Sequence, residues 1–510
     1  MEIINSVMTW LMKKRIHDIE LFIKYPHEVQ KEVLHNLVHT AEDTVYGKKY
    51  GFSGIKNFRQ FQQQLPVVSY ELLFPYIERI MKGEQQVLWP SKIKWFAKSS
   101  GTTNAKSKFI PVSQEALDDC HFKGGKDMIS IYVNNYPETR MFTGKNLAIG
   151  GSQQINQLDK NSDSYSGDVS AVIMKNLPFW AQLSRTPKLE IALMENWEEK
   201  IEKIARSTMD ENITSMAGVP TWTVFLLQRI MEIKNAKNIL EVWPNLELFI
   251  HGAVSFTPYR NLFKQLIPSD KMHYLETYNA SEGFFGIQDQ KNSDEMLLML
   301  DYGIFYEFIP AEEFDSEYPK TLDLSEVEVG KNYAVVISTN AGLWRYKIGD
   351  TIKFTSLEPF RFKISGRTKH FLNAFGEELI IENAERGLSI ACEKTGALID
   401  DFTAAPRYIG DGQKGCHEWI IEFSKAPADL DRFTDELDQA LRSINSDYDA
   451  KRTKDIAVTR PVIHQVEPGT FYRWMKKRGK LGGQNKVPRL SNQREFVEDI
   501  LKMMEEEAIR

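Results

Sequence analysis

Cysteine is scarce in this chain, with only Cys120, Cys392 and Cys416 among 510 residues. Three thiols that lie far apart provide neither a disulfide framework nor the close spacing of metal ligands. His417 stands beside Cys416, but no second pair of ligands accompanies it. The scarcity argues against a disulfide-stapled secreted domain and against a zinc site, so we expect reduced thiols in a cytoplasmic protein.

Long apolar runs and an excess of positive charge are also missing. No stretch approaches the roughly 18 apolar residues of a membrane span. At the N-terminus, the acidic Glu2 and the late Lys13-Lys14-Arg15 reverse the order of a secretory signal. The formal net charge is −6, with Lys and Arg spread along the chain, whereas nucleic-acid binders are usually basic. We expect no membrane and no nucleic acid as partner, and the composition leaves the oligomeric state open.

What remains is an ordinary globular composition, with 42% hydrophobic and 26% charged residues. Residues 2–48 predict two amphipathic helices, separated by a turn near Pro26. Strands and helices then alternate up to residue 255, as in α/β proteins. The expected strands are 94–97, 146–149, 170–174, 246–253 and 274–278, and the expected helices are 113–132, 197–209 and 221–233.

The second half of the chain is richer in strands. Alternating side chains predict antiparallel strands at 304–308, 333–338, 343–354 and 360–364. After Ser365 this pattern breaks, and a smaller α+β unit follows, with helices at 376–393 and 427–444 and strands at 418–423 and 462–466. We therefore predict a large N-terminal domain, residues 1–365, and a small C-terminal domain, residues 366–510. The predicted fold class is α/β with a β-rich portion.

The stretch from residue 98 to 109 carries the most chemistry. Hydroxyl groups surround a single glycine there, and lysines follow at 106 and 108: the residues are Ser99, Ser100, Gly101, Thr102 and Thr103. Backbone N–H groups and hydroxyls in such a loop can face an anion, although the Walker A spacing is absent. The alternative is a solvated surface loop of Ser, Thr and Lys.

Further candidates follow strand ends, where α/β folds bind ligands. Gly252 and Ala253 would let a flat ring approach the backbone, or they form a tight turn. Tyr278 ends a predicted strand and precedes Glu282, a combination of ring and carboxylate that suits a nucleotide with Mg²⁺, although an isolated Glu282 would be a surface glutamate. Asp350 follows a glycine and could accept hydrogen bonds from ribose hydroxyls, or it closes an Asx turn.

Near the C-terminus, residues 479–489 hold three glycines together with Lys486 and Arg489. Such a composition is typical of a mobile cationic loop, and equally of a solvated basic linker. The aromatic and Met content of the 113–132 helix and of segments 174–180 and 216–222 would suit an apolar acid, and core packing explains it as well.

Taken in chain order, these segments resemble the auxin-responsive GH3 family of acyl-acid amido synthetases, which belongs to the adenylate-forming superfamily of acyl-CoA synthetases and luciferases. The matching phrases are Ser99–Thr103, Tyr278–Glu282, Tyr306–Pro310, Gly342–Asp350, Pro468–Phe471 and Gln484–Arg489. Departures include Trp344 for a tyrosine, Asn104-Ala105 after the first phrase and Asn485 for an aromatic residue. None removes a residue that the chemistry needs, and no plant hormone is assigned as substrate.

The resemblance implies an adenylate-forming fold with a mobile C-terminal domain, ATP and Mg²⁺ as cofactors, and a small carboxylic acid and an amino acid or other amine as substrates. It implies a nucleotide site formed by Ser99, Ser100, Gly101, Thr102, Thr103, Gly252, Ala253, Tyr278, Asn279, Ala280, Ser281, Asp350, Arg367 and Lys486. Within it, Glu282 would hold Mg²⁺, Arg367 would contact the ribose or α-phosphate, and Lys486 would bridge the carboxylate and the α-phosphate. Lys369 is the second choice for the bridging lysine.

Two other functions fit the same residues. A carboxylic acid–CoA ligase shares the first half-reaction, and the phrases at 306–310 and 468–489 argue against it through resemblance. A non-catalytic acyl-adenylate binder would have no need of Lys486.

Overall fold

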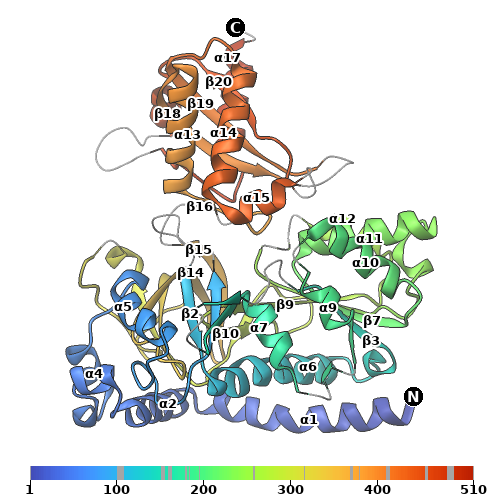
Figure 1. The fold of residues 1–510 in the computed structure, drawn as a ribbon, viewed down its shortest axis with the longest axis vertical. Helices are drawn as coiled ribbons and strands as arrows, with labels where there is room; N and C mark the ends of the chain where they lie inside the picture. Colours follow the sequence, from blue (N-terminus) through green and yellow to red (C-terminus); the bar gives the residue numbers. More distant parts are fainter. Residues whose placement is uncertain are drawn as a thin grey trace.

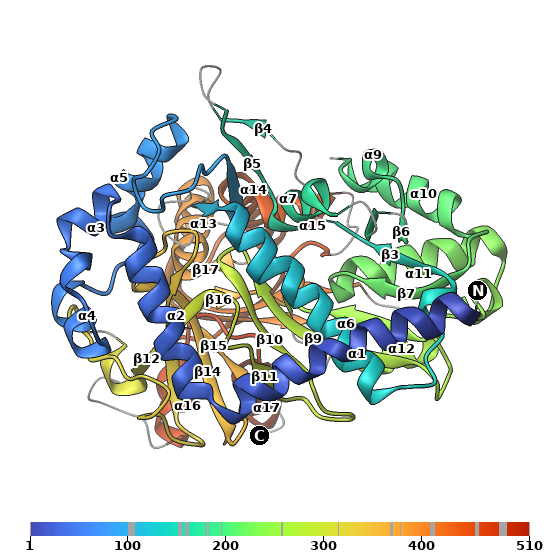
Figure 2. The ribbon, with the colours of Figure 1, turned by 90° about the horizontal axis from the view of Figure 1, so that it is seen from below.

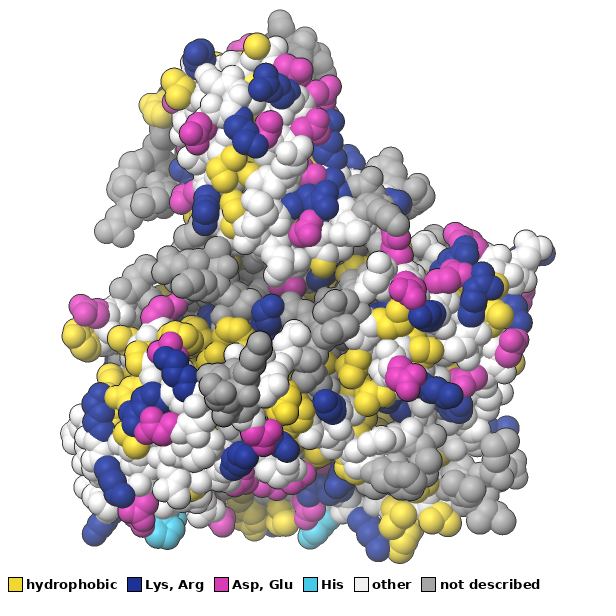
Figure 3. Space-filling model, in the orientation of Figure 1, with side chains coloured by type: hydrophobic (Ala, Val, Ile, Leu, Met, Phe, Trp, Pro, Cys, Tyr) yellow, Lys and Arg dark blue, Asp and Glu magenta, His cyan; other side chains and the backbone are white. Residues whose placement is uncertain are grey.

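The computed structural model describes most of the chain. The described residues are 2–99, 108–150, 156–158, 163–178, 181–182, 184–194, 196–254, 256, 259–314, 316–367, 371–377, 379–408, 414–453, 458–478 and 487–508. They form a broad lower body and a smaller upper unit, with the N-terminus on the lower body and the C-terminus at the far end of the upper unit (Figure 1). Seen as a surface, the outline narrows between these two parts (Figure 3).

An eleven-stranded sheet organises the lower body, in the order β12-β13-β14-β15-β11-β10-β9-β8-β7-β3-β6. Strands β6, β3, β7, β8 and β9 are parallel, and the rest of the sheet is antiparallel. The strands are β3 (Lys145–Ala148), β6 (Arg185–Thr186), β7 (Ile213–Ala217), β8 (Leu248–His251), β9 (His273–Ala280), β10 (Gly283–Ile287), β11 (Met296–Leu298), β12 (Ile304–Pro310), β13 (Asn332–Thr339), β14 (Tyr346–Leu357) and β15 (Phe360–Arg367). The predicted change from α/β alternation to an antiparallel region is therefore present.

Helices cover the sheet, and two of them lie side by side beneath it (Figure 2). Arg15 on the first of these, α1, reaches Asp127 on the second, α6, with Nε 2.7 Å from Oδ1. The Tyr302 hydroxyl donates to the same carboxylate at 2.9 Å. The helices of this body are α1 (Glu2–Lys24), α2 (Pro26–Ala41), α3 (Val45–Lys49), α4 (Phe58–Gln64), α5 (Tyr70–Met81), η2 (Ala116–Phe122), α6 (Lys123–Asn135), α7 (Val169–Asn176), α9 (Leu189–Ala192), α10 (Trp197–Thr208), α11 (Pro220–Lys234) and α12 (Arg260–Leu266).

One predicted strand is wrong. Residues 170–174, which we expected to be a strand, belong to helix α7. Val169, Val172 and Ile173 are β-branched and favour strands, yet they also stand at the i, i+3, i+4 spacing of a helix face. Packing of that face against the hydrophobic core overrides the strand propensity.

A second, four-stranded sheet has the order β2-β1-β5-β4. Its strands are β1 (Trp95–Ser99), β2 (Lys108–Val112), β4 (Asn156–Gln157) and β5 (Tyr165–Gly167). Strands β1 and β2 pair antiparallel, so the residues between them connect two neighbouring strands.

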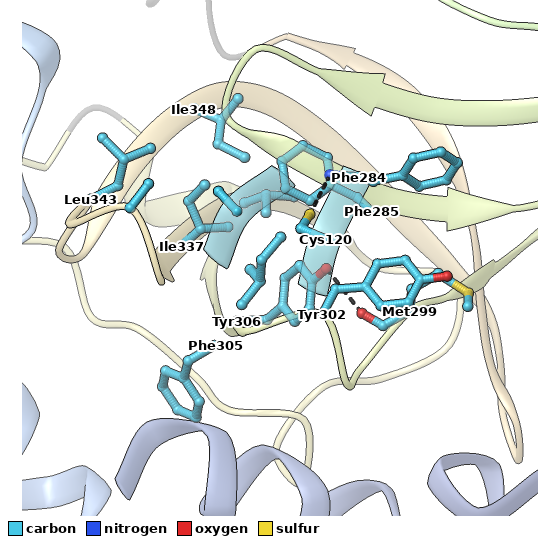
Figure 4. Close-up of a cluster of buried hydrophobic side chains, with 14 of the residues drawn as sticks. Cys120, Phe284, Phe285, Met299, Tyr302, Phe305, Tyr306, Ile337, Leu343 and Ile348 are labelled. Atoms are coloured by element: carbon cyan, nitrogen blue, oxygen red, sulfur yellow. Dashed lines mark hydrogen bonds between the residues drawn. The ribbon is translucent and has the colours of Figure 1, made fainter. Parts of the chain in front are cut away.

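Aromatic and aliphatic side chains from the antiparallel strands pack into one continuous core (Figure 4). Cys120 lies within it and accepts a hydrogen bond from the Phe284 backbone N–H at 3.2 Å, and the Tyr306 hydroxyl donates to the Met299 carbonyl at 3.1 Å. All three cysteines are free, as predicted, and burial raises the pKa of the Cys120 thiol to about 12. The Cys120 thiol is therefore neutral at physiological pH.

The upper unit is a three-stranded sheet with helices packed against it (Figure 1). Its elements, with a short strand pair at its base, are β16 (Phe371–Leu372), β17 (Leu379–Ile380), α13 (Ile381–Thr395), β18 (Leu398–Arg407), β19 (Cys416–Lys425), α14 (Leu430–Ile444), α15 (Ser446–Arg452), β20 (Val462–Val466), α16 (Thr470–Lys477) and α17 (Glu495–Ala508). Within the described ranges, no helix has the length and apolarity needed to cross a bilayer.

Two hydrogen bonds join the two parts through residues that directly follow β16. The Tyr259 hydroxyl donates to the Ala374 carbonyl at 2.8 Å, and the Asn373 amide donates to the Ala253 carbonyl at 3.3 Å. The division into domains 1–365 and 366–510 stays a prediction, and these contacts lie just beyond the predicted junction.

Candidate active site

The first phrase lies in the connection of a hairpin. Ser99 ends β1, Lys108 begins β2, and the two are register partners. The chain therefore closes at this point, and Ser100, Gly101, Thr102 and Thr103 between them lie outside the described residues. Because Ser99 and Lys108 pair across the two strands, both residues that flank the connection lie at the same edge of the sheet.

Lys108 links this hairpin to the Gly342–Asp350 phrase. Its Nζ lies 3.3 Å from the Tyr346 hydroxyl, and Tyr70 packs near the same ammonium, with its ring centroid 5.7 Å away. The Lys108 side chain is buried, so its positive charge is held close to the base of the hairpin. A fixed cation there would favour an anionic ligand at residues 100–107.

The second phrase forms the tip of another hairpin. Strand β9 ends at Ala280, β10 begins at Gly283, and these residues pair across the two-residue turn Ser281-Glu282. A turn of two residues is the shortest hairpin connection, so Glu282 is held within one residue of each strand. Its carboxylate is partly exposed at the strand ends, where it can meet a ligand.

Tyr278 and Asp350 contact each other directly. The Tyr278 hydroxyl donates to Asp350 Oδ2 at 2.5 Å, and both side chains are buried, at 8% and 9% exposure. Asp350 is also the register partner of Arg367, whose side chain lies outside the described part of the structure. Three predicted residues from distant parts of the chain therefore converge at the start of β14.

Gly252 and Ala253 follow strand β8. A Cβ at position 252 would collide with the Thr277 carbonyl oxygen of the neighbouring strand β9, so only glycine fits there. Ala253 has φ +69°, a left-handed conformation that costs an L-residue free energy and that clusters at functional sites. The Asn373 hydrogen bond to the Ala253 carbonyl holds this turn beneath the upper unit. The tight turn considered above is thus present, and its adenine contact stays a prediction.

Lys486 and Lys369 lie outside the described residues, but the segment directly after Lys486 is well anchored. Val487 onward runs along β18, where the Ala404 N–H donates to the Arg489 carbonyl at 2.9 Å and the Thr403 hydroxyl donates to the Pro488 carbonyl at 2.6 Å. The Arg489 guanidinium pairs with Asp401. The residues that follow Lys486 in sequence are therefore fixed to the upper unit.

The Gly342–Asp350 phrase is fixed from behind by a buried ion pair. Arg345 Nη2 lies 2.8 Å from Glu307 Oε1, and Arg345 also donates to Thr321 Oγ1 at 2.7 Å. Its remaining N–H groups reach the carbonyls of Gln62 and Leu65. Glu307 belongs to the 306–310 phrase, so this pair joins two of the matching phrases. Its role is structural, because the pair lies in the interior.

A π-helical segment, η2, packs against the second phrase. Burial lowers the pKa of His121 to about 4, although a side-chain hydrogen bond with Asn279 opposes this shift. A neutral imidazole is therefore held beside Asn279, and π-helical turns are frequent at functional sites. The acyl pocket that we expected near this helix stays a prediction.

Sequence reasoning missed three residues that the structure brings to this region: His121, Asn373 and Glu276. Asn373 follows the predicted junction, where contacts between the two parts could have been expected. Glu276 stands two residues before Tyr278 on the same strand face, and that spacing was the available signal. Among the described residues, no cluster of three or more His, Cys, Asp or Glu side chains is placed to hold a metal ion.

Comparisons with known proteins agree with this architecture. The GH3 family N-terminal domain matches residues 15–272, the GH3 family central domain residues 297–367 and the GH3 family C-terminal domain residues 382–495. The first of these alone spans more than half of the chain. The protein is therefore a member of the GH3 family, and the predicted family is confirmed.

Individual relatives are distant but cover nearly the whole chain. The indole-3-acetic acid-amido synthetase GH3.3 of Arabidopsis thaliana is 24% identical over 93% of this chain and 91% of its own. Indole-3-acetic acid-amido synthetase GH3.8 of Oryza sativa subsp. indica is 24% identical, with 90% and 87% covered.

Solved structures show the same fold. The GH3.15 acyl acid amido synthetase has a TM-score of 0.61 at 17% identity, covering 96% of each chain. A 2-hydroxyisobutyryl-CoA ligase has a TM-score of 0.56 at 12% identity, covering 95% of this chain and 93% of its own. The predicted fold class, that of the adenylate-forming enzymes, is confirmed.

Proposed function

We propose that this protein is an ATP-dependent acyl-acid amido synthetase. It adenylates a small carboxylic acid, expels pyrophosphate, and conjugates the acyl group to an amino acid or other amine with release of AMP. The observation that carries the proposal is the meeting of the matching phrases at strand β14. Lys108 contacts Tyr346, 238 positions further along the chain. Tyr278 contacts Asp350, 72 positions further along. Both contacts are made to the Gly342–Asp350 phrase, so three phrases that are distant in sequence adjoin one site. Family membership supports the same activity.

The first half-reaction brings two anions together, so positioning and charge stabilisation dominate its catalysis. The Ser99–Thr103 loop would hold the β- and γ-phosphates of ATP, with Lys108 as a fixed cation at its base. Asp350 would accept the ribose hydroxyl hydrogen bonds, and Tyr278 would orient that carboxylate while its ring borders adenine. Lys486 would bridge the acyl carboxylate and the α-phosphate, since a flexible point charge suits a transient contact.

Glu282 would hold Mg²⁺ together with phosphate oxygens. The fit rests on an oxygen ligand at a partly exposed hairpin tip, and a cation that keeps its waters needs only one or two carboxylates. Bound there, Mg²⁺ would neutralise the charge of the phosphates.

The second half-reaction needs an amine in place of Lys486. We propose that domain 366–510 rotates about residues 365–371, which withdraws Lys486 with the β18 edge and opens the site. Such a movement protects a reactive mixed anhydride from water until the acceptor binds. The three free thiols support the cytoplasmic location that we propose.

A single product experiment tests the function. Purified protein is incubated with Mg²⁺-ATP, a pool of small aliphatic and aromatic carboxylic acids, the twenty amino acids and CoA, and the products are identified by mass spectrometry. An acyl–amino acid conjugate with AMP is the expected result. An acyl-CoA product would instead make the protein a CoA ligase, the branch represented by the 2-hydroxyisobutyryl-CoA ligase fold. Absence of ATP consumption with every acid would contradict catalysis.

The substitution Asp350→Ala is expected to raise the KM for ATP by about tenfold or more, because hydrogen bonds to a charged group contribute roughly 1.5–3 kcal/mol each. Its effect on kcat should be smaller. Tyr278→Phe keeps the ring and removes only the hydroxyl donor, so a milder change is expected from it. Pyrophosphate exchange at varied ATP concentrations measures both, and an unchanged ATP KM in Asp350→Ala would refute the ribose role.

A further inference from the structure

A carboxyl on the parallel part of the large sheet and a guanidinium on the following helix are linked through two stacked rings. Glu276 lies on β9, two residues before Tyr278, and is the register partner of His251 on β8. The His251 ring stacks on Phe256, with ring centroids 4.0 Å apart, and the Arg260 guanidinium lies 5.5 Å above the Phe256 ring. These side chains form one continuous patch from β9 to the start of helix α12.

No ion pair joins either charged group of this patch to another described side chain, although the positive charge of Arg260 acts on the Glu276 carboxyl. The structure gives Arg260 the Phe256 ring contact and no ion pair within the described ranges. The Glu276 backbone is bonded to Gln288, whereas no hydrogen bond or ion pair joins its carboxylate to a described side chain. A carboxylate that is largely withdrawn from water is costly unless a cation meets it.

The patch lies where the two parts of the molecule meet. Helix α12 is at the edge of the lower body that faces the upper unit (Figure 1). Tyr259, directly before Arg260, donates to the Ala374 carbonyl, and Asn373 reaches Ala253. A rotation of the upper unit would therefore open or close access to Glu276 and Arg260.

We propose that Glu276 and Arg260 form the acceptor site and that it takes an amino acid. Glu276 binds the ammonium group and accepts a proton from it, and Arg260 binds the carboxylate. This inference rests on the proposed function and specifies its second substrate. A simple amine would use only half of the site, whereas an amino acid carries both complementary charges.

The proposed step balances as follows. The acceptor nitrogen first loses one proton to the Glu276 carboxylate. The neutral amine then attacks the acyl carbon, the C–N bond forms, and the bond from this carbon to the phosphate oxygen breaks. AMP leaves with that electron pair, and the second proton of the nitrogen leaves with AMP, which releases it to water.

The surroundings of Glu276 suit a proton acceptor at neutral pH. Burial raises the pKa of Glu276 to about 7, and the positive charge of Arg260 opposes this while Asp294 adds to it. Asp294 is itself paired with Lys363 at 2.7 Å. His251 is uncharged, because burial lowers its pKa to about 3, and burial raises the pKa of Tyr274 to about 12. Only Glu276 of this set changes its charge near pH 7.

The test separates the two half-reactions with Glu276→Gln, which keeps the size of the side chain. Three rates are measured with the same acid pool: pyrophosphate exchange, hydroxamate formation with hydroxylamine, and amide formation with the twenty amino acids. Hydroxylamine is a neutral nucleophile without a carboxylate, so it needs neither Glu276 nor Arg260. We expect exchange and hydroxamate formation within about twofold of wild type and amide formation lower by about 10²-fold or more.

The pH dependence gives a second readout. Protonated Glu276 cannot accept a proton, so wild-type kcat/KM for the amino acid mixture should rise with pH through about pH 7. In Glu276→Gln this rise should be absent. Equal amide formation by Glu276→Gln and wild type, or an equal fall in all three rates, would overturn the assignment.

Arg260→Ala tests the carboxylate contact at an exposed position, where folding is not at risk. Its KM for the amino acid mixture should rise about tenfold, the loss of one charge-assisted contact, and its KM for the matching amino acid amides should not change. Lys264→Ala, one turn further along α12, is the matched control and should behave as wild type. A similar loss with the amides, or a similar loss in Lys264→Ala, would refute the contact.

Failure of the inference is distinguishable from failure of the proposed function. Wild-type protein that forms no conjugate with any acid and amino acid overturns both. Wild-type protein that forms a conjugate, together with variants at 276 and 260 that form it equally well, overturns only the acceptor site.

Discussion

Replacing Arg345 by alanine is expected to lower the free energy of unfolding by about 3–5 kcal/mol, the usual cost of breaking a buried ion pair from one side. Both partners are almost fully withdrawn from solvent, with exposed side-chain fractions of 5% for Arg345 and 1% for Glu307. The variant would leave the Glu307 carboxylate buried without its cation, and the carbonyls of Gln62 and Leu65 would each lose a donor. Urea unfolding followed by tryptophan fluorescence measures the difference.

The matched control is Lys82→Ala at the residue that follows α5, which removes an exposed partner of Glu78 and should cost less than about 1 kcal/mol. A double variant, Arg345→Met with Glu307→Leu, should be more stable than Arg345→Ala, because it buries no unpaired charge. If Arg345→Ala costs no more than the Lys82 control, the ion pair does not hold the phrase in place.

The substitution Lys486→Ala is expected to slow adenylation by about 10²-fold or more, the scale of losing one preorganised electrostatic group in an active site. The lysine would neutralise charge where the carboxylate attacks the α-phosphate, so the loss should appear in the rate of pyrophosphate exchange. Amide formation from a preformed acyl-adenylate should be nearly unchanged, since the proposed domain rotation would by then have withdrawn Lys486.

Lys477→Ala is the control for this prediction, because Lys477 is an exposed cation on α16 that pairs with Glu506. It should leave pyrophosphate exchange at the wild-type rate. Wild-type exchange in Lys486→Ala, together with a large loss in Lys369→Ala, would transfer the bridging role to Lys369. Wild-type exchange in both variants would mean that no lysine of these two segments bridges the reacting groups.

Strands with clean alternation were predictable from the sequence. The expected strand at 462–466 is β20 with the same bounds, and the strands expected at 304–308 and 333–338 are the cores of β12 and β13. The strand expected to begin at residue 343 begins at Tyr346 instead. Gly342 and Arg345 have φ values of +84° and +44°, so the chain turns here. The pattern of alternating polar and apolar residues does not reveal this turn, because its side chains are apolar or pack inward.

The members of the candidate site could be named from sequence, but their contacts could not. Tyr278 was expected to border adenine and Asp350 to bind ribose, and nothing in their spacing shows that the hydroxyl of one donates to the carboxylate of the other. That contact depends on how the ends of β9 and β14 approach each other, which register and twist decide. Glu276 was missed for a related reason, since its spacing of two residues from Tyr278 places it on the same strand face but does not show that its carboxyl is buried.

The anchoring of Arg489 also bears on how the proposed bridging lysine, Lys486, would reach the reacting groups. Residues on both sides of segment 479–486 are held by the upper unit, through Arg478 with Glu495 on one side and Arg489 with Asp401 on the other. If Lys486 bridges the reacting groups as proposed, two anchors so close in sequence would set its effective concentration at the site. Because effective concentration falls steeply as a tether lengthens beyond the required span, the length of this segment would then be a determinant of the adenylation rate.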